Sequence, residues 1–591
     1  MTVSDYIFNF LTLKGVNTVF MITGGQAMFL DDAVGRNKKI KYICMHHEQA
    51  AGMAAEAYGR ITGKLGVALV TAGPAAINAL NGVVGGWTDS SPMMVISGQA
   101  PLAYVQYQQK NRIRQHGIQG INIKPLVEKI TKYFVTVDNP SLIQYYMQKA
   151  YYFATTGRNG PVWIDVPLDI QNMTVPDRLL TEFIPENDSV SKTLKNKVTT
   201  TLRLFAKSRR PIILAGQGVR NGKAINEFRQ LINKMPVPVL TSRLGIDLIN
   251  SDHYLYVGRP GNYGERAAHF AIQNADLILV LGSRLASALI GHNPKDFGRN
   301  AKIVVVDIDK EELDKPGANI HLKINSDIKL FLNEVLDQID SFKPLTIKDW
   351  INRCNEWKKN YPVVLLEYKL EKPINSYYFT DKLSQLTSAK NMILVDTGSC
   401  FHIVCQTWKI KKGQRFLTTG GISSMGYWVA SIGACVANNY QNTIVITGDG
   451  SLQMNIQELA TIKHGNFPIK IIIFNNNGYL LIRQTQKNFM DGRLIGESPD
   501  TGVWCPDSLK IAKAYGIKGV RINSVIGLKK KIQEVLEYNG PVICDVMTPE
   551  WQSIIPRTAS YRNSEGFLVP KPYEDMYPFL NNKELLSNMK R

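Results

Sequence analysis

Short runs of aliphatic residues, each closed by a turn and followed by an amphipathic stretch, recur along the chain. Runs of this kind, rich in β-branched residues, are typical of strands buried on both faces of a parallel sheet. The clearest ones cover residues 18–22, 39–44, 67–70, 162–166, 211–216, 275–284, 302–307 and 469–474. We therefore predict an α/β fold built from doubly wound parallel sheets.

The strand runs fall into three groups, which predicts three domains. We expect them over residues 1–180, 197–342 and 373–548, followed by a C-terminal tail over 549–591. Residues 177–196 are polar, contain Pro185 and show no clear period, so we interpret them as a linker. The tail contains Pro570 and Pro578 with an acidic pair between them, which favours an ordered turn over a regular element.

Composition and charge exclude several classes of protein among the 591 residues. No run of about 18 apolar residues occurs, and residues 1–5 lack a basic region followed by an apolar stretch, so we expect a cytoplasmic protein with no membrane partner. The seven cysteines include no Cys-x-x-Cys pair, which argues against a disulfide framework or a zinc site. The formal charge of +20 is spread along the chain, so we expect solvated surface and no nucleic acid partner.

Two polar motifs flank the aliphatic run 469–474. Gly448-Asp449-Gly450-Ser451 precedes it and Asn475-Asn476-Asn477 closes it. Asp449 and Asn476 lie 27 positions apart, and the residues between them read as one helix and one strand, which returns the chain to the same sheet edge. Two oxygen ligands then face one divalent cation, while the glycines and a helix start near residue 451 suit a diphosphate. A lone Gly-Asp-Gly is only a tight turn, but the spaced asparagine favours a magnesium-diphosphate cradle.

This pattern resembles the diphosphate-binding motif of thiamine diphosphate enzymes, and the chain is similar to acetolactate synthase large subunits over nearly its whole length. The resemblance implies that Asp449, Asn476 and the carbonyl of Gly478 hold Mg²⁺. It also implies a pyrimidine-binding domain, a central nucleotide-binding-like domain and a diphosphate-binding domain, in that order. In the family, the activating glutamate and the metal cradle belong to opposite subunits, so we expect a homodimer or homotetramer.

Three further segments carry residues that the resemblance implies to be catalytic. Glu48, at the start of a small-residue helix, matches the glutamate that hydrogen-bonds the aminopyrimidine ring, although a carboxylate there is ordinarily a helix-dipole partner. Met425, in the segment 420–427, matches the apolar wedge between the two cofactor rings, although methionine is more often core filler. Gln119 matches a residue that reaches the reacting carbon.

Other residues are implied to contact the cofactor. Segment 73–78 looks like the family's Gly-Pro-Gly-x-x-Asn turn with Ala75 in place of the second glycine, and residues 398–399 stand where acetolactate synthases have Gly-Gln. The full set of implied cofactor-binding residues is Gly24, Gly25, Gly73, Asn78, Gly398, Ser399, Gly448, Asp449, Gly450, Ser451, Asn476 and Gly478.

The chain departs from acetolactate synthases around the implied acceptor pocket. Ile118 and Gly120 replace a phenylalanine and a glutamate, and Thr485 replaces a tryptophan, so we expect a roomier pocket. Arg483 enters the same helix, and an arginine in a cleft wall suits a carboxylate or phosphate.

The implied central domain leaves the flavin question open. Arg284 and Asp307 fall in segments that resemble those holding the adenine nucleotide part of FAD in acetolactate synthases. The family's Asp-Asp-Arg is Ala286-Ser287-Ala288 here, which speaks against FAD, and Gly216-x-Gly218 alone does not indicate a dinucleotide.

The predicted function is decarboxylation of a pyruvate-like 2-oxo acid, followed by addition of the resulting enamine to a second carbonyl compound. The tail is expected to cover the catalytic surface as a lid or strap. The alternatives are a non-oxidative 2-oxo acid decarboxylase, a carboligase acting on a keto-sugar in polysaccharide synthesis, a flavin-dependent pyruvate oxidase and a non-catalytic regulatory paralogue.

Overall fold

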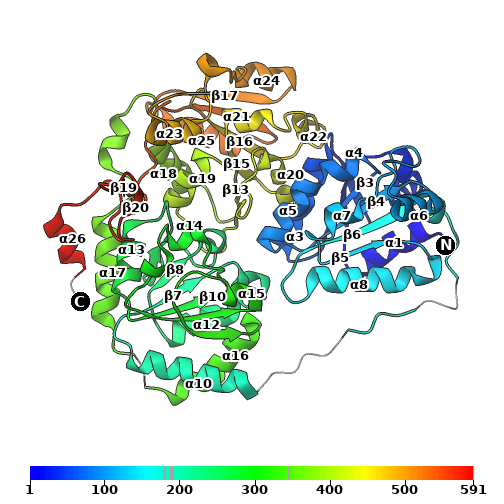
Figure 1. Cartoon of the computed structure of the whole chain (residues 1–591). Coiled ribbons are helices and arrows are strands. Elements are labelled where there is room, and N and C mark those ends of the chain that lie inside the picture. Colours follow the sequence, from blue (N-terminus) through cyan, green and yellow to red (C-terminus); the bar gives the residue numbers. More distant parts are fainter. Residues whose placement is uncertain (177–180, 186–191, 344, 590–591) are drawn as a thin grey trace.

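Three parallel six-stranded sheets, each covered by helices, form the protein (Figure 1). The computed structural model describes residues 1–176, 181–185, 192–343 and 345–589. We call the sheets and their helices the first unit (β1–β6), the central unit (β7–β12) and the third unit (β13–β18). The prediction of doubly wound parallel sheets is confirmed. Within the described residues, no helix is both long and apolar enough to cross a bilayer.

The first unit has the strand order β2-β1-β3-β4-β6-β5. Its strands are β1 (Thr18–Met21), β2 (Lys41–Cys44), β3 (Gly66–Val70), β4 (Met93–Gln99), β5 (Tyr133–Thr136) and β6 (Pro161–Pro167). Its helices are α1 (Val3–Leu13), α2 (Met28–Arg36), α3 (Glu48–Thr62), α4 (Pro74–Asn78), α5 (Leu80–Asp89), α6 (Leu102–Asn111), α7 (Lys124–Val127), α8 (Ile143–Thr155) and α9 (Leu168–Gln171).

The third unit repeats this topology, with the order β14-β13-β15-β16-β18-β17. Its strands are β13 (Met392–Val395), β14 (Phe416–Thr418), β15 (Thr443–Gly448), β16 (Ile469–Asn475), β17 (Lys518–Ile522) and β18 (Val542–Met547). Its helices are α18 (Ser376–Leu386), α19 (Ser399–Thr407), α20 (Ala430–Ala437), α21 (Asp449–Gln453), α22 (Glu458–His464), α23 (Leu480–Phe489), α24 (Ser508–Ala514) and α25 (Leu528–Glu537).

The central unit has a different order, β12-β11-β10-β7-β8-β9. Numbered within the unit and read from the other edge, this is the 3-2-1-4-5-6 order of dinucleotide-binding sheets. Its strands are β7 (Pro211–Ala215), β8 (Val239–Thr241), β9 (Tyr256–Gly258), β10 (Leu277–Leu281), β11 (Lys302–Asp307) and β12 (Ile320–Asn325). Its helices are α10 (Lys192–Lys207), α11 (Gly218–Asn221), α12 (Ile225–Lys234), α13 (Arg266–Asn274), α14 (Ser287–Ile290), α15 (Lys310–Asp314), α16 (Ile328–Gln338) and α17 (Lys348–Asn360).

The first and third units pack against each other through α3 and α20, which lie side by side in Figure 1. Both helices are rich in alanine and glycine, so their backbones approach closely. A Cβ atom added to Gly433 of α20 would lie 2.0 Å from the carbonyl oxygen of Ala54 in α3. No side chain larger than hydrogen fits there without separating the two units.

Two local predictions need correction. The chain between Asp449 and Asn476 forms two short helices, α21 and α22, because the turn at residues 454–457 interrupts the predicted single helix. The predicted linker 177–196 is partly wrong, since α10 already begins at Lys192, and residues 177–180 and 186–191 lie outside the described part of the chain.

The tail packs mainly on the central unit, so the predicted strap over the catalytic surface is wrong for most of its length. Tyr573 stacks on His269 of α13 with ring centroids 4.0 Å apart. Asn588 of α26 (Asn582–Asn588) accepts a 2.8 Å hydrogen bond from the indole of Trp357, and Figure 1 shows α26 beside α17. The tail also forms the hairpin β19 (Ser560–Arg562) and β20 (Leu568–Pro570). Beyond it, residues 573–574 form a turn, as predicted, and Tyr577 forms an isolated bridge with Arg557.

Candidate active site

The third sheet has a topological switch point between β13 and β15, because the chain leaves these neighbouring strands in opposite directions. Ligands of open α/β sheets bind in the crevice at such a point, outside the carboxyl ends of the strands. Gly398 and Ser399 follow β13, and residues 448–451 follow β15, so the topology brings these predicted residues together. A Cβ atom added to Gly398 or Gly448 would meet no atom within 4 Å, which leaves open space on both sides of the crevice.

Asp449 is a buried carboxylate with no cationic partner among the described residues. Its side chain accepts backbone hydrogen bonds from Gly450 at 3.0 Å and Gly478 at 2.9 Å. Burial raises its pKa to about 6. The side-chain oxygen of Asn476, a residue only 4% exposed, is buried without a hydrogen-bond partner in the described structure. An uncompensated carboxylate beside an unpaired amide oxygen fits a hard divalent cation such as Mg²⁺.

Asp396, which the sequence interpretation missed, organises the same crevice. Its carboxylate is fully buried, and burial raises its pKa to about 6. Four donors surround it: the backbone N–H groups of Thr397 at 2.8 Å and Tyr427 at 3.1 Å, and the hydroxyls of Thr447 at 2.8 Å and Ser451 at 2.6 Å. A signal was present, because Asp396 follows β13 as Asp449 follows β15.

Met425 lies next to this network. The backbone N–H of Gly426 donates a 2.8 Å hydrogen bond to the hydroxyl of Ser451, so the turn that carries Met425 is fixed to the first turn after β15. Met425 itself is half-buried in that turn. The predicted wedge residue and the predicted diphosphate residues are therefore held together.

A second cluster of predicted residues forms in the first unit. His47 caps α3 by accepting a hydrogen bond from the Gln49 N–H at 3.1 Å, which makes Glu48 the first helical residue. The side-chain amide of Asn78 donates a 3.0 Å hydrogen bond to a carboxylate oxygen of Glu48. Glu48 is half-buried and Asn78 is exposed, so the pair is open to a ligand or a partner.

Two turns support this cluster. Gly73 has φ +64°, and a Cβ atom there would lie 2.6 Å from the carbonyl oxygen of Gln119, so the two turns touch. Gln119 is exposed and has φ +58°. Gly24 follows β1, and a Cβ atom there would lie 2.4 Å from the side chain of Thr71, so packing at the strand end explains this glycine. A Cβ atom on Gly25 would meet no atom within 4 Å.

In the described part of the chain, no hydrogen bond or ion pair joins the Glu48–Asn78 pair to the Asp449–Asn476 site. The loop before α3 instead contacts α22, where the N–H of His46 donates to the carboxylate of Glu458 at 2.9 Å. The two halves of the predicted site are thus separate clusters within one chain.

Comparison with known proteins bears on both clusters. The thiamine pyrophosphate enzyme N-terminal TPP binding domain matches residues 1–126, the central domain of these enzymes matches 198–335, and their C-terminal TPP binding domain matches 396–546. The acetolactate synthase large subunit of Cyanidium caldarium is 31% identical over 95% of this chain and 96% of its own length. The chain belongs to the thiamine pyrophosphate enzyme family.

Two more relatives agree with this membership, which was predicted from the motifs. The acetolactate synthase large subunit of Lactococcus lactis subsp. lactis is 31% identical, with 96% of each chain covered. The probable acetolactate synthase large subunit of Methanocaldococcus jannaschii is 32% identical over 92% of this chain and 91% of its own length. Glu48 lies inside the segment that matches the N-terminal TPP binding domain, and Asp449 lies inside the segment that matches the C-terminal one.

Arg483 does not line an open pocket, so the expectation that it recognises an anionic substrate is wrong. Its side chain is only 3% exposed and forms a buried ion pair with Glu497. Its Nη atoms donate to the backbone carbonyls of Asn476 at 3.3 Å, Asn477 at 3.1 Å, Glu497 at 3.3 Å and Glu550 at 2.6 Å. All five donors of the guanidinium are engaged, and two of them hold the loop that carries Asn476 and Asn477.

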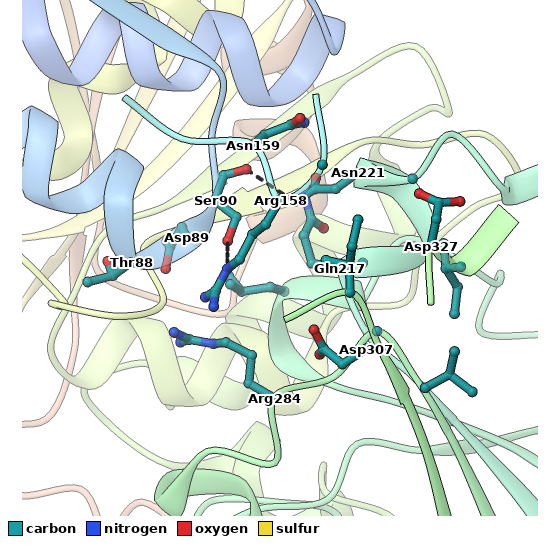
Figure 2. Close-up of a pocket in the computed structure, with 18 residues that line it drawn as sticks. Thr88, Asp89, Ser90, Arg158, Asn159, Gln217, Asn221, Arg284, Asp307 and Asp327 are labelled. Carbon is teal, nitrogen blue, oxygen red and sulfur yellow. Dashed lines mark hydrogen bonds between the residues drawn. The ribbon is translucent and has the colours of Figure 1, made fainter. Parts of the chain in front are cut away.

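The central sheet has its own switch point, between β7 and β10, and a cleft lies there (Figure 2). Arg158 from the first unit, Arg284 from the loop after β10 and Asp307 all line it, and Figure 2 shows the two arginine side chains on the same side of Asp307. Arg158 is also tied to the acidic residues Asp309 at 2.5 Å and Glu312 at 3.1 Å.

Gly216 and Gly218, at the carboxyl end of β7, are explained by packing. A Cβ atom on Gly216 would lie 2.2 Å from the carbonyl oxygen of Gly282, and one on Gly218 would lie 2.6 Å from the Cα of Gly282. The cavities along the cleft measure about 90 and 130 Å³. Pockets for drug-sized ligands measure about 300 Å³ or more, so each of these two cavities is small by comparison.

Proposed function

We propose that this protein is a Mg²⁺-dependent member of its family that decarboxylates a pyruvate-like 2-oxo acid and joins the product to a second carbonyl compound. The observation that carries the proposal is the pairing of a buried, uncompensated Asp449 with the unpaired oxygen of Asn476, at the switch point of the sheet. The similarity to acetolactate synthase large subunits supports the carboligase chemistry.

In this proposal, Asp449, Asn476 and the carbonyl of Gly478 hold the metal, and the open glycine turns after β13 and β15 receive the diphosphate. Glu48 exchanges a proton with the aminopyrimidine, and its hydrogen bond from Asn78 keeps the carboxylate oriented. Bound thiamine diphosphate supplies the electron sink for loss of carbon dioxide. Met425, on the turn fixed by Ser451, would pack against the bound cofactor.

We propose that the active site is completed between two subunits of a homodimer or homotetramer. The support is that Glu48 and Asn78 are accessible and make no contact with the Asp449 site in their own chain. Coexpression of a Glu48→Gln chain with an Asp449→Asn chain tests this arrangement. Each homomer has two damaged sites, whereas a hybrid dimer regains one intact site.

For random assembly of symmetric dimers, the mixture should recover roughly a quarter of the wild-type activity. If both groups act within one chain, every site in the hybrid keeps one damaged residue and no activity returns. The measurement is carbon dioxide release from pyruvate by the copurified mixture, with each homomer as its control. Light scattering of the wild type checks the oligomeric mass independently.

The second substrate is proposed to be a small 2-oxo acid. Arg483 no longer supports an anionic keto-sugar, because its donors are engaged inside the protein. The expected roomier pocket is not supported at Gly120, which is buried: a Cβ atom there would lie 2.4 Å from the carbonyl oxygen of His116, so packing explains this glycine. Thr485 is exposed. Purified protein supplied with pyruvate and a panel of 2-oxo acids, aldehydes and keto-sugars, followed by mass spectrometry, identifies the acceptor. A carbonyl product without ligation would instead identify a simple decarboxylase, and no turnover would identify a regulatory paralogue.

We propose that FAD is not a cofactor of this protein. The small cavities of the central cleft and the ion pairs of Arg158 across it support this. The visible absorbance spectrum of the purified protein tests the proposal, and a flavin spectrum at one equivalent would refute it and favour an oxidase or a structural flavin.

A further inference from the structure

A strongly basic cavity lies where the three units meet, apart from the switch points. It is bounded by the C-terminal end of α3, the segment from α11 to α12 and the residue just before β14. Its volume is about 460 Å³, which is in the range of small-molecule sites. Asn159 and Asn221 separate it from the cleft in Figure 2, because both residues line the two cavities.

Besides Arg60 of the first unit, four cationic side chains line this cavity: Arg220, Lys223 and Arg229 of the central unit, and Arg415 of the third. No Asp or Glu is among the described lining residues. Among the described residues, the acid that forms ion pairs with these four cations is Asp247, whose carboxylate is 1% exposed and pairs with Arg220 at 2.9 Å and Arg415 at 2.8 Å. One buried negative charge therefore faces four positive charges, and the imbalance favours an anionic ligand.

Several donors in the cavity are unused in the described structure. The Nε of Arg220 is buried without a hydrogen-bond partner. Arg415 donates from Nε to Asp247 and from Nη1 to the carbonyl of Ile61, which leaves Nη2 without a partner. Lys223 and Arg229 are exposed and form no described ion pair. Planar guanidinium donors held by a buried carboxylate are pre-organised for an oxyanion.

The fifth cation in the wall, Arg60, does not contribute free charge. Arg60 is fully buried and pairs with Glu56 at 3.2 Å and Asp89 at 2.9 Å. The basic character therefore comes from the two residues on the floor, Arg220 and Arg415, and the two on the rim, Lys223 and Arg229.

We propose that this cavity binds the phosphate group of a small molecule, with Arg220 and Arg415 contacting the oxygens directly and Lys223 and Arg229 neutralising the second charge. Four cations around one buried acid suit a dianion better than a single carboxylate. Free phosphate and a phosphate monoester share this chemistry. The proposal does not depend on the reaction that the protein catalyses.

Equilibrium dialysis with inorganic phosphate and with glycerol 2-phosphate tests this phosphate-binding proposal. The protein is first saturated with thiamine diphosphate and Mg²⁺, so that the diphosphate site is already occupied and does not bind the probes. The variant Lys223→Ala/Arg229→Ala removes the rim charges, and its affinity for the bound probe should fall by about tenfold or more. The control Arg203→Ala/Lys207→Ala removes the same charge from exposed positions on α10 and should stay within about twofold of wild type.

The two probes distinguish the sources, since a site for monoesters binds glycerol 2-phosphate at least as tightly as inorganic phosphate. Single Arg229→Ala gives a second reading if the double variant fails to fold, with a smaller loss of affinity expected. The proposal would be overturned if wild type bound neither probe saturably, or if wild type and the double variant bound a probe with equal affinity. A change of oligomeric mass in the double variant would also overturn it, by assigning the cavity to a subunit contact.

Discussion

The variant Arg483→Met isolates the contribution of a buried arginine to the metal loop. The substitution keeps most of the side-chain volume, so the main change is electrostatic. Glu497, whose side chain is 1% exposed, is left as a buried carboxylate without its counter-charge. Removing one partner of such a pair typically costs about 3–5 kcal/mol. The carbonyls of Asn476 and Asn477 also lose their donors, at about 1 kcal/mol each.

We expect Arg483→Met to lower the free energy of unfolding in urea by about 5–7 kcal/mol, the sum of these terms. The double variant Arg483→Met/Glu497→Gln should recover part of that loss, because no charge is then buried alone. Both variants should bind Mg²⁺ and thiamine diphosphate about tenfold more weakly in calorimetry, since neither restores the hydrogen bonds to the loop.

The control is Arg493→Met, which removes an arginine whose side chain is 75% exposed and pairs with Asp491 at 3.3 Å on the surface. Such a pair contributes about 1 kcal/mol or less. If Arg483→Met costs no more than this control and leaves cofactor affinity unchanged, the guanidinium does not hold the loop and the argument is refuted.

Three further outcomes are expected. Glu48→Gln should abolish carbon dioxide release from pyruvate while calorimetry still detects cofactor binding; retained turnover would contradict its role. Because burial raises the pKa of Asp165 to about 7 from 3.8, stability should fall by up to about 4 kcal/mol as pH rises between these values. Asp165→Asn should remove that fall in urea titrations at pH 4 and pH 8, and an unchanged slope would contradict it. Gly73→Ala should lower Tm and weaken cofactor binding, because φ is +64° and the new Cβ would lie 2.6 Å from Gln119, whereas Gly63→Ala, also at positive φ but in open space, should cost less.

The strands were predictable because buried parallel strands leave long aliphatic runs in the sequence. Residues 302–307 form β11 with the predicted bounds, and 469–474 lie within β16. Asp449 and Asn476 were found because their spacing matches one return of the chain to the same sheet edge, and the fold preserves that edge although two short helices replace the predicted one.

The errors arose where the outcome depends on contacts between distant segments. Arg483 carries no local sign that Glu497 and Glu550 will surround it. The tail binds the central unit through Tyr573 and Asn588, whose partners on α13 and α17 lie more than two hundred positions earlier. Neither contact leaves a periodic pattern, so only the folded structure reveals it.

The crevice of the third sheet holds two buried carboxylates, Asp396 and Asp449, and burial raises the pKa of each to about 6. The number of hydrogen-bond donors around each carboxylate distinguishes their roles. A carboxylate has about four lone-pair sites. Asp396 uses four, on donors from β13, β15, α21 and the turn of Met425, so it is complete without a ligand and acts by joining those segments. Asp449 uses two, both from the backbone of its own loop and of Gly478, and therefore keeps the capacity that a cation needs.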